Sequence, residues 1–191
     1  MLLLLSLLLA ADPVAAPASA PDTTRTISGV TLPENITVAG KTLTLNGVAL
    51  RKKAIFKVYV AALYVLTKSQ SANAIQEEDE PRRMEMHFVR NVDKKKICEA
   101  WDDGLKDNTP DASEDLKKEF ADLCGLMDDI KDGQAMTFTY VPGNGTTVTV
   151  AGVEKGTVGG RDFANALLRC WIGPKPGPGE GFKKNLLSVK D

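Results

Sequence analysis

The sequence has very few of the side chains that bind metals or form nucleophilic pairs. It contains one histidine, His87, and three cysteines, Cys98, Cys124 and Cys170, with no C-x-x-C spacing. A zinc site needs a cluster of such ligands, and a histidine-based triad needs partners placed around its histidine. We therefore expect no metal, no cofactor and no chemistry of the triad type.

An excess of charge of one sign is also lacking. The formal net charge is -1, and Lys and Arg are scattered along the chain. Nucleic acids and anionic lipid surfaces both attract concentrated basic patches, so the sequence indicates neither as a partner. The acid-rich stretches at residues 76–80 and 102–132 are interpreted as a solvated loop and solvated helix faces.

The leucine-rich run at residues 2–9 is too short to span a membrane as a helix. Small residues follow it and end in Ala18-Ser19-Ala20, the A-x-A pattern of a signal-peptide cleavage site, although no basic residues precede the run. We interpret residues 1–20 as a signal peptide, 21–35 as an N-terminal lead-in and 36–191 as one domain. The expected protein is exported, periplasmic or secreted, and has no stable membrane span.

Three segments in the first half of the domain predict β-strands. Residues 36–47 alternate apolar and polar side chains and include the turn signals Ala39-Gly40-Lys41 and Asn46-Gly47, which predict a hairpin. Residues 55–66 are almost continuously apolar and rich in β-branched and aromatic side chains, which predicts a strand buried on both faces. Residues 84–88 alternate Met and Phe with Glu and His, which predicts a strand with one solvated face.

Amphipathic helices are predicted in the second half. The first begins at Asp93, and the second opens at Asp111 with Glu114 in capping-box spacing. A strand hairpin within residues 136–150 and a helix at 161–171 follow. Strands, a helix pair, a hairpin and a last helix predict an α+β fold in which an antiparallel sheet carries helices on one face.

Cys98 and Cys124 are candidates for a disulfide. They lie at comparable distances from the predicted turn at Thr109 and Pro110, so an antiparallel helix pair can bring them face to face. Two buried thiols fit the sequence equally well, because nothing fixes the rotation of either helix. Cys170, in the last helix, is interpreted as a small buried residue.

Three separated blocks of the sequence resemble the chalcone-isomerase-like family. They run from Leu45 to Tyr64, from Met86 to Arg90 and from Gly156 to Pro174. The resemblance covers essentially all of the chain after Ile36. It implies an open-faced β-sandwich, which is a large curved antiparallel sheet with helices packed on one face and a ligand cleft between the two.

The polar network of the family's plant enzymes is mostly absent from this chain. Those enzymes use an Arg before the signature strand, a strand Thr, and a helix-borne Tyr and Asn. Arg51 matches the first, but the resemblance puts Tyr59 at the Thr, Asp93 and Ala100 near the Tyr and Asn, and Cys170 at a later Ser or Thr. Ala100 has no side-chain donor with which to stabilise developing charge.

A plastid branch of the family keeps an Arg and a Tyr that hold the carboxylate of a fatty acid, and Arg51 and Tyr59 match this pair. The resemblance therefore implies non-catalytic binding of a fatty acid or similar small amphipathic carboxylic acid in the cleft. The candidate ligand-binding residues are Arg51, Tyr59, Tyr64, Cys170 and Trp171.

Three alternatives are consistent with the same residues. The chain could be an isomerase of the intramolecular-lyase type that acts on an unknown phenolic or enone substrate. Residues 51–53 could be a solvated basic turn without a ligand, and the aromatic residues could belong to the core. A structural or interaction domain with a closed cleft is the third alternative, and a cavity beside Arg51 would argue against it.

Overall fold

The computed structural model describes residues 23–188, so the predicted signal peptide at residues 1–20 lies outside the described part of the chain. The strands are β1 (Thr24–Ile27), β2 (Val30–Pro33), β3 (Asn35–Val38), β4 (Lys41–Lys53), β5 (Phe56–Val65), β6 (Arg82–Phe88), β7 (Ala135–Val141), β8 (Gly145–Val150) and β9 (Val153–Val158). The helices are α1 (Ala72–Glu77), α2 (Lys94–Asn108), α3 (Glu114–Gly125), α4 (Arg161–Ile172) and α5 (Glu180–Leu186).

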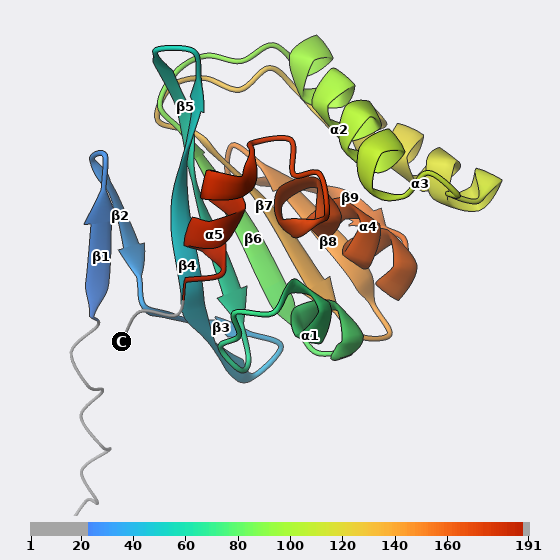
Figure 1. Cartoon of the computed structure of the whole chain (residues 1–191), viewed down its shortest axis with the longest axis horizontal. Helices are drawn as coiled ribbons and strands as arrows, with labels where there is room; N and C mark the ends of the chain where they lie inside the picture. Colours follow the sequence, from blue (N-terminus) through green and yellow to red (C-terminus); the bar gives the residue numbers. More distant parts are fainter. Residues whose placement is uncertain (1–22, 189–191) are drawn as a thin grey trace, which may run out of the picture.

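A seven-stranded antiparallel sheet forms the body of the protein. Its order is β3-β4-β5-β6-β7-β8-β9, so every strand pairs with its neighbours along the chain. The sheet is curved, and helices α1, α4 and α5 lie in front of it in Figure 1 while the α2–α3 pair extends to one side. The predicted α+β fold, a curved antiparallel sheet with helices packed on one face, is confirmed.

Strand β5 is buried on both faces, as its sequence predicts. Its odd-numbered side chains from Tyr59 to Val65 pack in the main core beneath the helices. Its even-numbered side chains from Val60 to Tyr64 pack in a second core that also contains Leu32 of β2. The β1–β2 hairpin therefore covers the face that the helices leave open, and residues 24–33 of the predicted lead-in form part of the fold (Figure 1).

The predicted hairpin turn at Ala39 and Gly40 is confirmed, because Val38 pairs with Lys41 across β3 and β4. Asn46 and Gly47 instead form a bulge inside β4, and the prediction of a turn there is wrong. The register of β4 against β5 shifts between Leu45 and Gly47. The Asn46 side chain is buried. Its Nδ2 donates to the carbonyl oxygens of Ser69 at 3.0 Å and Leu186 at 2.8 Å, and its Oδ1 accepts from the Ser69 backbone N at 2.8 Å. A Cβ on Gly47 would overlap the Leu186 carbonyl oxygen, so the bulge lets α5 dock closely.

The helix pair follows the prediction with one correction. Helix α2 begins after Asp93 as expected, and the carboxylate of Asp129 accepts from the Lys94 backbone N at 2.8 Å. Helix α3 begins at Glu114, not at Asp111, because the Ser113 hydroxyl caps it by accepting from the Leu116 backbone N at 3.2 Å. None of the helices within residues 23–188 is long and apolar enough to cross a bilayer.

A disulfide joins the two helices. Cys98 of α2 and Cys124 of α3 are bonded, with their Cα atoms 5.3 Å apart. Cys170 is a free, buried thiol. The disulfide closes a local loop of the chain, which restricts the unfolded state and holds α3 against α2.

Asn46→Ala should lower the free energy of unfolding by about 2 to 4 kcal/mol, because it leaves the Ser69 amide and the Leu186 carbonyl without their buried partner. Asn73→Ala, at an exposed position of α1, is the matched control and should change stability by less than about 0.5 kcal/mol. Urea denaturation measures both. Equal stability of the two variants would show that the Asn46 bonds do not hold α5 in place.

Candidate ligand-binding site

A cavity of about 410 Å³ lies between the sheet and the helices. Its walls come from the ends of β4, β5 and β6 near the β4–β5 hairpin, from α2 and α4, and from Gly177 and Pro178 before α5. A cavity beside Arg51 argues against the closed-cleft alternative. Its volume falls within the roughly 300 to 1,000 Å³ of pockets that hold small organic ligands.

The inner wall of the cavity is apolar. Val58 and Phe88 contribute from the sheet, and Ile97 and Trp101 contribute from one face of α2 because they are four residues apart on the helix. Trp171 of α4 packs edge-on against Trp101, with ring centroids 5.3 Å apart. The wall therefore combines two helices and two strands in a surface suited to a hydrocarbon chain.

Tyr59 and Trp171 connect the sheet to α4 at this wall. The Trp171 indole Nε1–H donates to the Tyr59 hydroxyl oxygen at 3.2 Å. The Tyr59 O–H itself has no acceptor among the described residues. Burial raises the pKa of Tyr59 to about 12, so at neutral pH the phenol keeps its proton and can donate it to a ligand.

Trp101 offers a second donor. Its side chain is buried and lines the cavity, and its Nε1–H has no acceptor within residues 23–188. A buried donor without an acceptor is costly, so an acceptor atom on a ligand would stabilise this arrangement.

Arg51 is a cation of the cavity lining. It is paired with Tyr59 across β4 and β5, so the two side chains leave the sheet on the same face. Its guanidinium makes no ion pair and no hydrogen bond to the side chains or backbone of residues 23–188. An arginine in this position is available to an external anion.

Three more cations line the cavity, and no Asp or Glu does so. Lys53 follows Arg51 on β4, Arg90 lies over the ring of Phe56 at 4.6 Å, and Lys96 pairs with the exposed Asp93 at 3.1 Å. Because no lining carboxylate balances these charges, the site favours an anionic ligand.

The structure brings four of the five candidate residues to the cavity, which are Arg51, Tyr59, Cys170 and Trp171. Tyr64 is the exception, and that prediction is corrected. It is five residues from Tyr59 on one strand, an odd spacing that puts it on the opposite face of the sheet. There its hydroxyl donates to the Pro33 carbonyl oxygen at 3.0 Å.

The sequence prediction missed Lys53, Phe56, Arg90 and Lys96 as lining residues. They belong to two segments of the chain, one before β5 and one after β6. A signal was present, since the start of β5 and the end of β6 must lie at the same end of an antiparallel sheet. Trp101 belongs both to the core and to the cavity wall.

The sequence profile of the chalcone isomerase-like family matches residues 24–188. The chain belongs to the chalcone isomerase-like family. Among solved structures, a fatty-acid binding protein of Arabidopsis thaliana is similar to it, with a TM-score of 0.69, 17% identity, and coverage of 86% of this chain and 96% of that one. At this identity the likeness shows a shared fold. The comparison with curated protein sequences found no match.

In this chalcone isomerase-like protein, Cys170 is a poor nucleophile and Ala100 has no hydrogen-bonding side chain. Burial raises the pKa of the Cys170 thiol to about 12, so it stays a neutral thiol and a poor nucleophile. Gly104 of α2 lies against it, and a Cβ at Gly104 would be 2.5 Å from the Cys170 sulfur. Ala100 lines the cavity but offers no donor, whereas Asp93 is outside the lining.

No group of three or more His, Cys, Asp or Glu side chains within residues 23–188 converges as a metal site. The cavity lining combines hydrogen-bond donors and cations with an apolar inner wall. Such a set can hold an anion and orient it, and it contains no carboxylate or imidazole that would accept a proton from a ligand.

The three tyrosines of this chalcone isomerase-like protein should resist ionisation. Burial raises the pKa of Tyr59 and Tyr140 to about 12 and is also the main cause of the raised pKa of Tyr64. The tyrosines of an unfolded chain ionise at about pH 10. The folded protein should therefore gain no phenolate absorbance near this pH. The stability linked to these groups is fully present below about pH 10 and is lost as pH rises toward about 12.

A spectrophotometric pH titration of folded protein, with urea-unfolded protein as the control, measures this shift. A tyrosine that ionises near pH 10 while the protein remains folded would contradict the burial of its hydroxyl.

Proposed function

We propose that this protein binds a medium- or long-chain fatty acid, or a similar amphipathic carboxylic acid, in the cavity beside Arg51. The observation that carries the proposal is the composition of the lining. Four cations and no carboxylate surround a pocket whose inner wall is apolar. An amphipathic acid matches both parts, because its head group is anionic and its tail is hydrocarbon.

Arg51 and Tyr59 are the proposed anchor for the carboxylate. A guanidinium can donate two parallel hydrogen bonds to a carboxylate, and a phenol can donate one more. The two residues face each other across paired strands, and the guanidinium and the phenolic proton both lack partners within residues 23–188. The acceptor side of the Tyr59 hydroxyl is already used by Trp171, so this hydroxyl is oriented to donate.

The hydrocarbon tail would lie against the apolar wall formed by Val58, Phe88, Ile97, Trp101 and Trp171. Transfer of each methylene from water to such a wall contributes about 0.8 kcal/mol. The tail therefore supplies most of the affinity, and the anchor fixes its orientation. The shared fold with a fatty-acid binding protein supports a ligand of this chemical class.

We also propose that the protein works after export, in the periplasm or outside the cell. The Cys98–Cys124 disulfide supports this location, because structural disulfides persist in oxidising compartments. The partner in this proposal is a small lipid.

Arg51→Ala should weaken binding of a fatty acid by about 1 to 2 kcal/mol, which is about fivefold to thirtyfold in Kd. The loss is moderate because Arg51 is partly exposed to solvent. Arg51→Lys should lose less binding free energy, since it keeps the positive charge and loses only the bidentate geometry. Tyr59→Phe should cost about 1 kcal/mol. Calorimetric titration of a fatty acid into delipidated protein measures all three.

The matched control is Lys106→Ala, which removes an exposed cation of α2 away from the cavity and should bind as the wild type does. Thermal unfolding of Tyr59→Phe should accompany the titration, because Trp171 loses an acceptor in that variant. Equal affinity of Arg51→Ala and wild type, with both folded, would mean that the carboxylate is held elsewhere or that the ligand is not an acid.

The alternative, an intramolecular-lyase-type isomerase, predicts turnover of a chalcone. We expect a cyclisation rate no higher than the rate in buffer, because Ala100 lines the cavity without a donor and Asp93 lies outside the lining. A spectrophotometric assay with heat-denatured protein as the blank measures this rate. Clear turnover would overturn the binding-only assignment in favour of the isomerase.

A further inference from the structure

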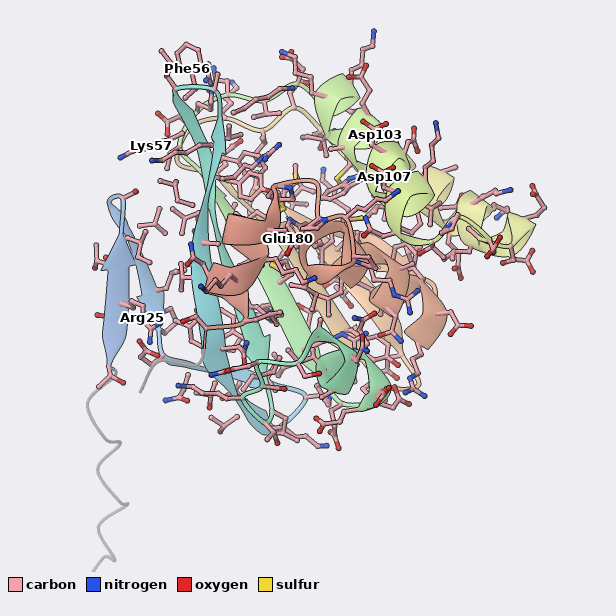
Figure 2. The ribbon with its side chains drawn as sticks, in the orientation of Figure 1. Arg25, Phe56, Lys57, Asp103, Asp107 and Glu180 are labelled. Carbon is pink, nitrogen blue, oxygen red and sulfur yellow. A yellow bond between two sulfur atoms is a disulfide. The ribbon has the colours of Figure 1, made fainter. Side chains whose placement is uncertain are left out.

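The tip of the β4–β5 hairpin, defined here as residues 52–57, exposes apolar side chains to solvent. Ile55 is 87% exposed and Phe56 is 54% exposed. Figure 2 shows Phe56 and Lys57 at the free end of the hairpin, clear of the helical layer. The only other large apolar side chain as open as these within residues 23–188 is Val153, at 56%. Two adjacent apolar side chains on a projecting tip indicate a contact site.

The backbone of the hairpin tip holds Ile55 outward. Lys53 pairs with Phe56, so the chain reverses through Ala54 and Ile55 alone. Ala54 has φ 53°, a left-handed conformation that costs a non-glycine residue about 1 kcal/mol. Ile55 therefore stands at the apex of a tight turn, where it has no neighbouring element to pack against.

The hairpin tip is also basic. Lys52, Lys53 and Lys57 are exposed, residues 51–57 contain no acid, and none of these lysines forms an ion pair with the described part of the chain. The near-neutral net charge of the whole sequence hides this cluster, because the acids that balance it lie elsewhere. The sequence-based expectation against anionic lipid surfaces rests on the scattering of Lys and Arg along the chain, whereas the hairpin tip gathers three lysines in one place.

We propose that the hairpin tip docks the protein on an anionic lipid bilayer, with Ile55 and Phe56 entering the interface and the lysines facing lipid phosphates. Apolar side chains next to cations are the pattern of interfacial membrane contacts, and each lysine near an anionic surface adds attraction. A protein partner is a poorer match, because a stable protein interface buries about 800 Å² on each side and the hairpin tip is a single narrow turn.

Docking by this tip would bring the cavity to the membrane surface. Lys53 and Phe56 belong both to the hairpin tip and to the cavity lining. A bilayer is a source of amphipathic acids, so the docked orientation would shorten the path of such a ligand between lipid and cavity. Docking itself needs no ligand, so it is separable from the proposed function.

Flotation of the full chain with lipid vesicles tests the proposal. We expect binding to vesicles of equal parts phosphatidylglycerol and phosphatidylcholine, much weaker binding to phosphatidylcholine alone, and release as salt increases. Ile55→Ser and the double variant Lys52→Gln/Lys57→Gln should each weaken binding to anionic vesicles by about tenfold or more.

The matched controls are Val153→Ser, at the other exposed apolar position, and Lys117→Gln/Lys118→Gln on α3, at the opposite side of the molecule (Figure 1). Both should bind vesicles as the wild type does. No binding of wild type to anionic vesicles, or equal binding by Ile55→Ser and Val153→Ser, would overturn the proposal.

Titration of a fatty acid without vesicles separates the two proposals. Ile55 does not line the cavity, so Ile55→Ser should bind the acid as wild type does. Loss of vesicle binding with unchanged acid binding in this variant supports docking by the tip. Vesicle binding by a wild-type protein that binds no acid would overturn the proposed function and leave docking standing.

Discussion

Strand β5 must keep both of its faces away from water, and the rest of the architecture depends on this constraint. The helical layer covers the face that carries Tyr59, and the β1–β2 hairpin covers the face that carries Tyr64. The cover is incomplete at one end. Exposure falls along β5 from Phe56 and Lys57, which are exposed, through Val58 to the buried run that begins at Tyr59. The cavity lies where the helical cover stops, so the site is a product of how far the helices extend along one strand.

Two arginines, Arg82 and Arg51, differ in how far the fold itself uses their hydrogen-bond donors. Arg82 is buried, donates to the Asn165 side chain at 2.5 Å and lies over the Tyr140 ring at 4.7 Å. Burial lowers its pKa to about 10. Its donors are used within the fold, and they tie β6 to α4. Arg51 has no such partners, which is why its charge is available to a ligand.

Long, strongly patterned elements could be predicted from the sequence. The two-faced apolar run of β5, the alternating strand β6 and helix α4 lie within two residues of their expected bounds. Arg51 and Tyr59 could be identified because a family resemblance pointed to them. Tyr64 could have been excluded from the site on strand periodicity alone, since five residues is an odd spacing.

Features that depend on distant partners could not be predicted in this way. Asn46-Gly47 is a strong local turn signal, but its role is decided by a hydrogen bond to Leu186, 140 residues away in the chain. The β1–β2 hairpin is made of four-residue strands, whose periodicity is too short to recognise. The cations of the cavity differ from these two features, because the antiparallel pairing of β5 with β6 already implies that the segments before β5 and after β6 meet at one end of the sheet.

The contact between Gly104 and Cys170 has a consequence for how this family can vary. The two helices that wall the cavity touch at a point where one residue has no side chain and the other has a small one. Substitution of either residue alone by a larger one would force α2 and α4 apart. A larger residue at position 104 would therefore require a smaller one at position 170, so this contact limits how far substitutions can widen or narrow the cavity between α2 and α4.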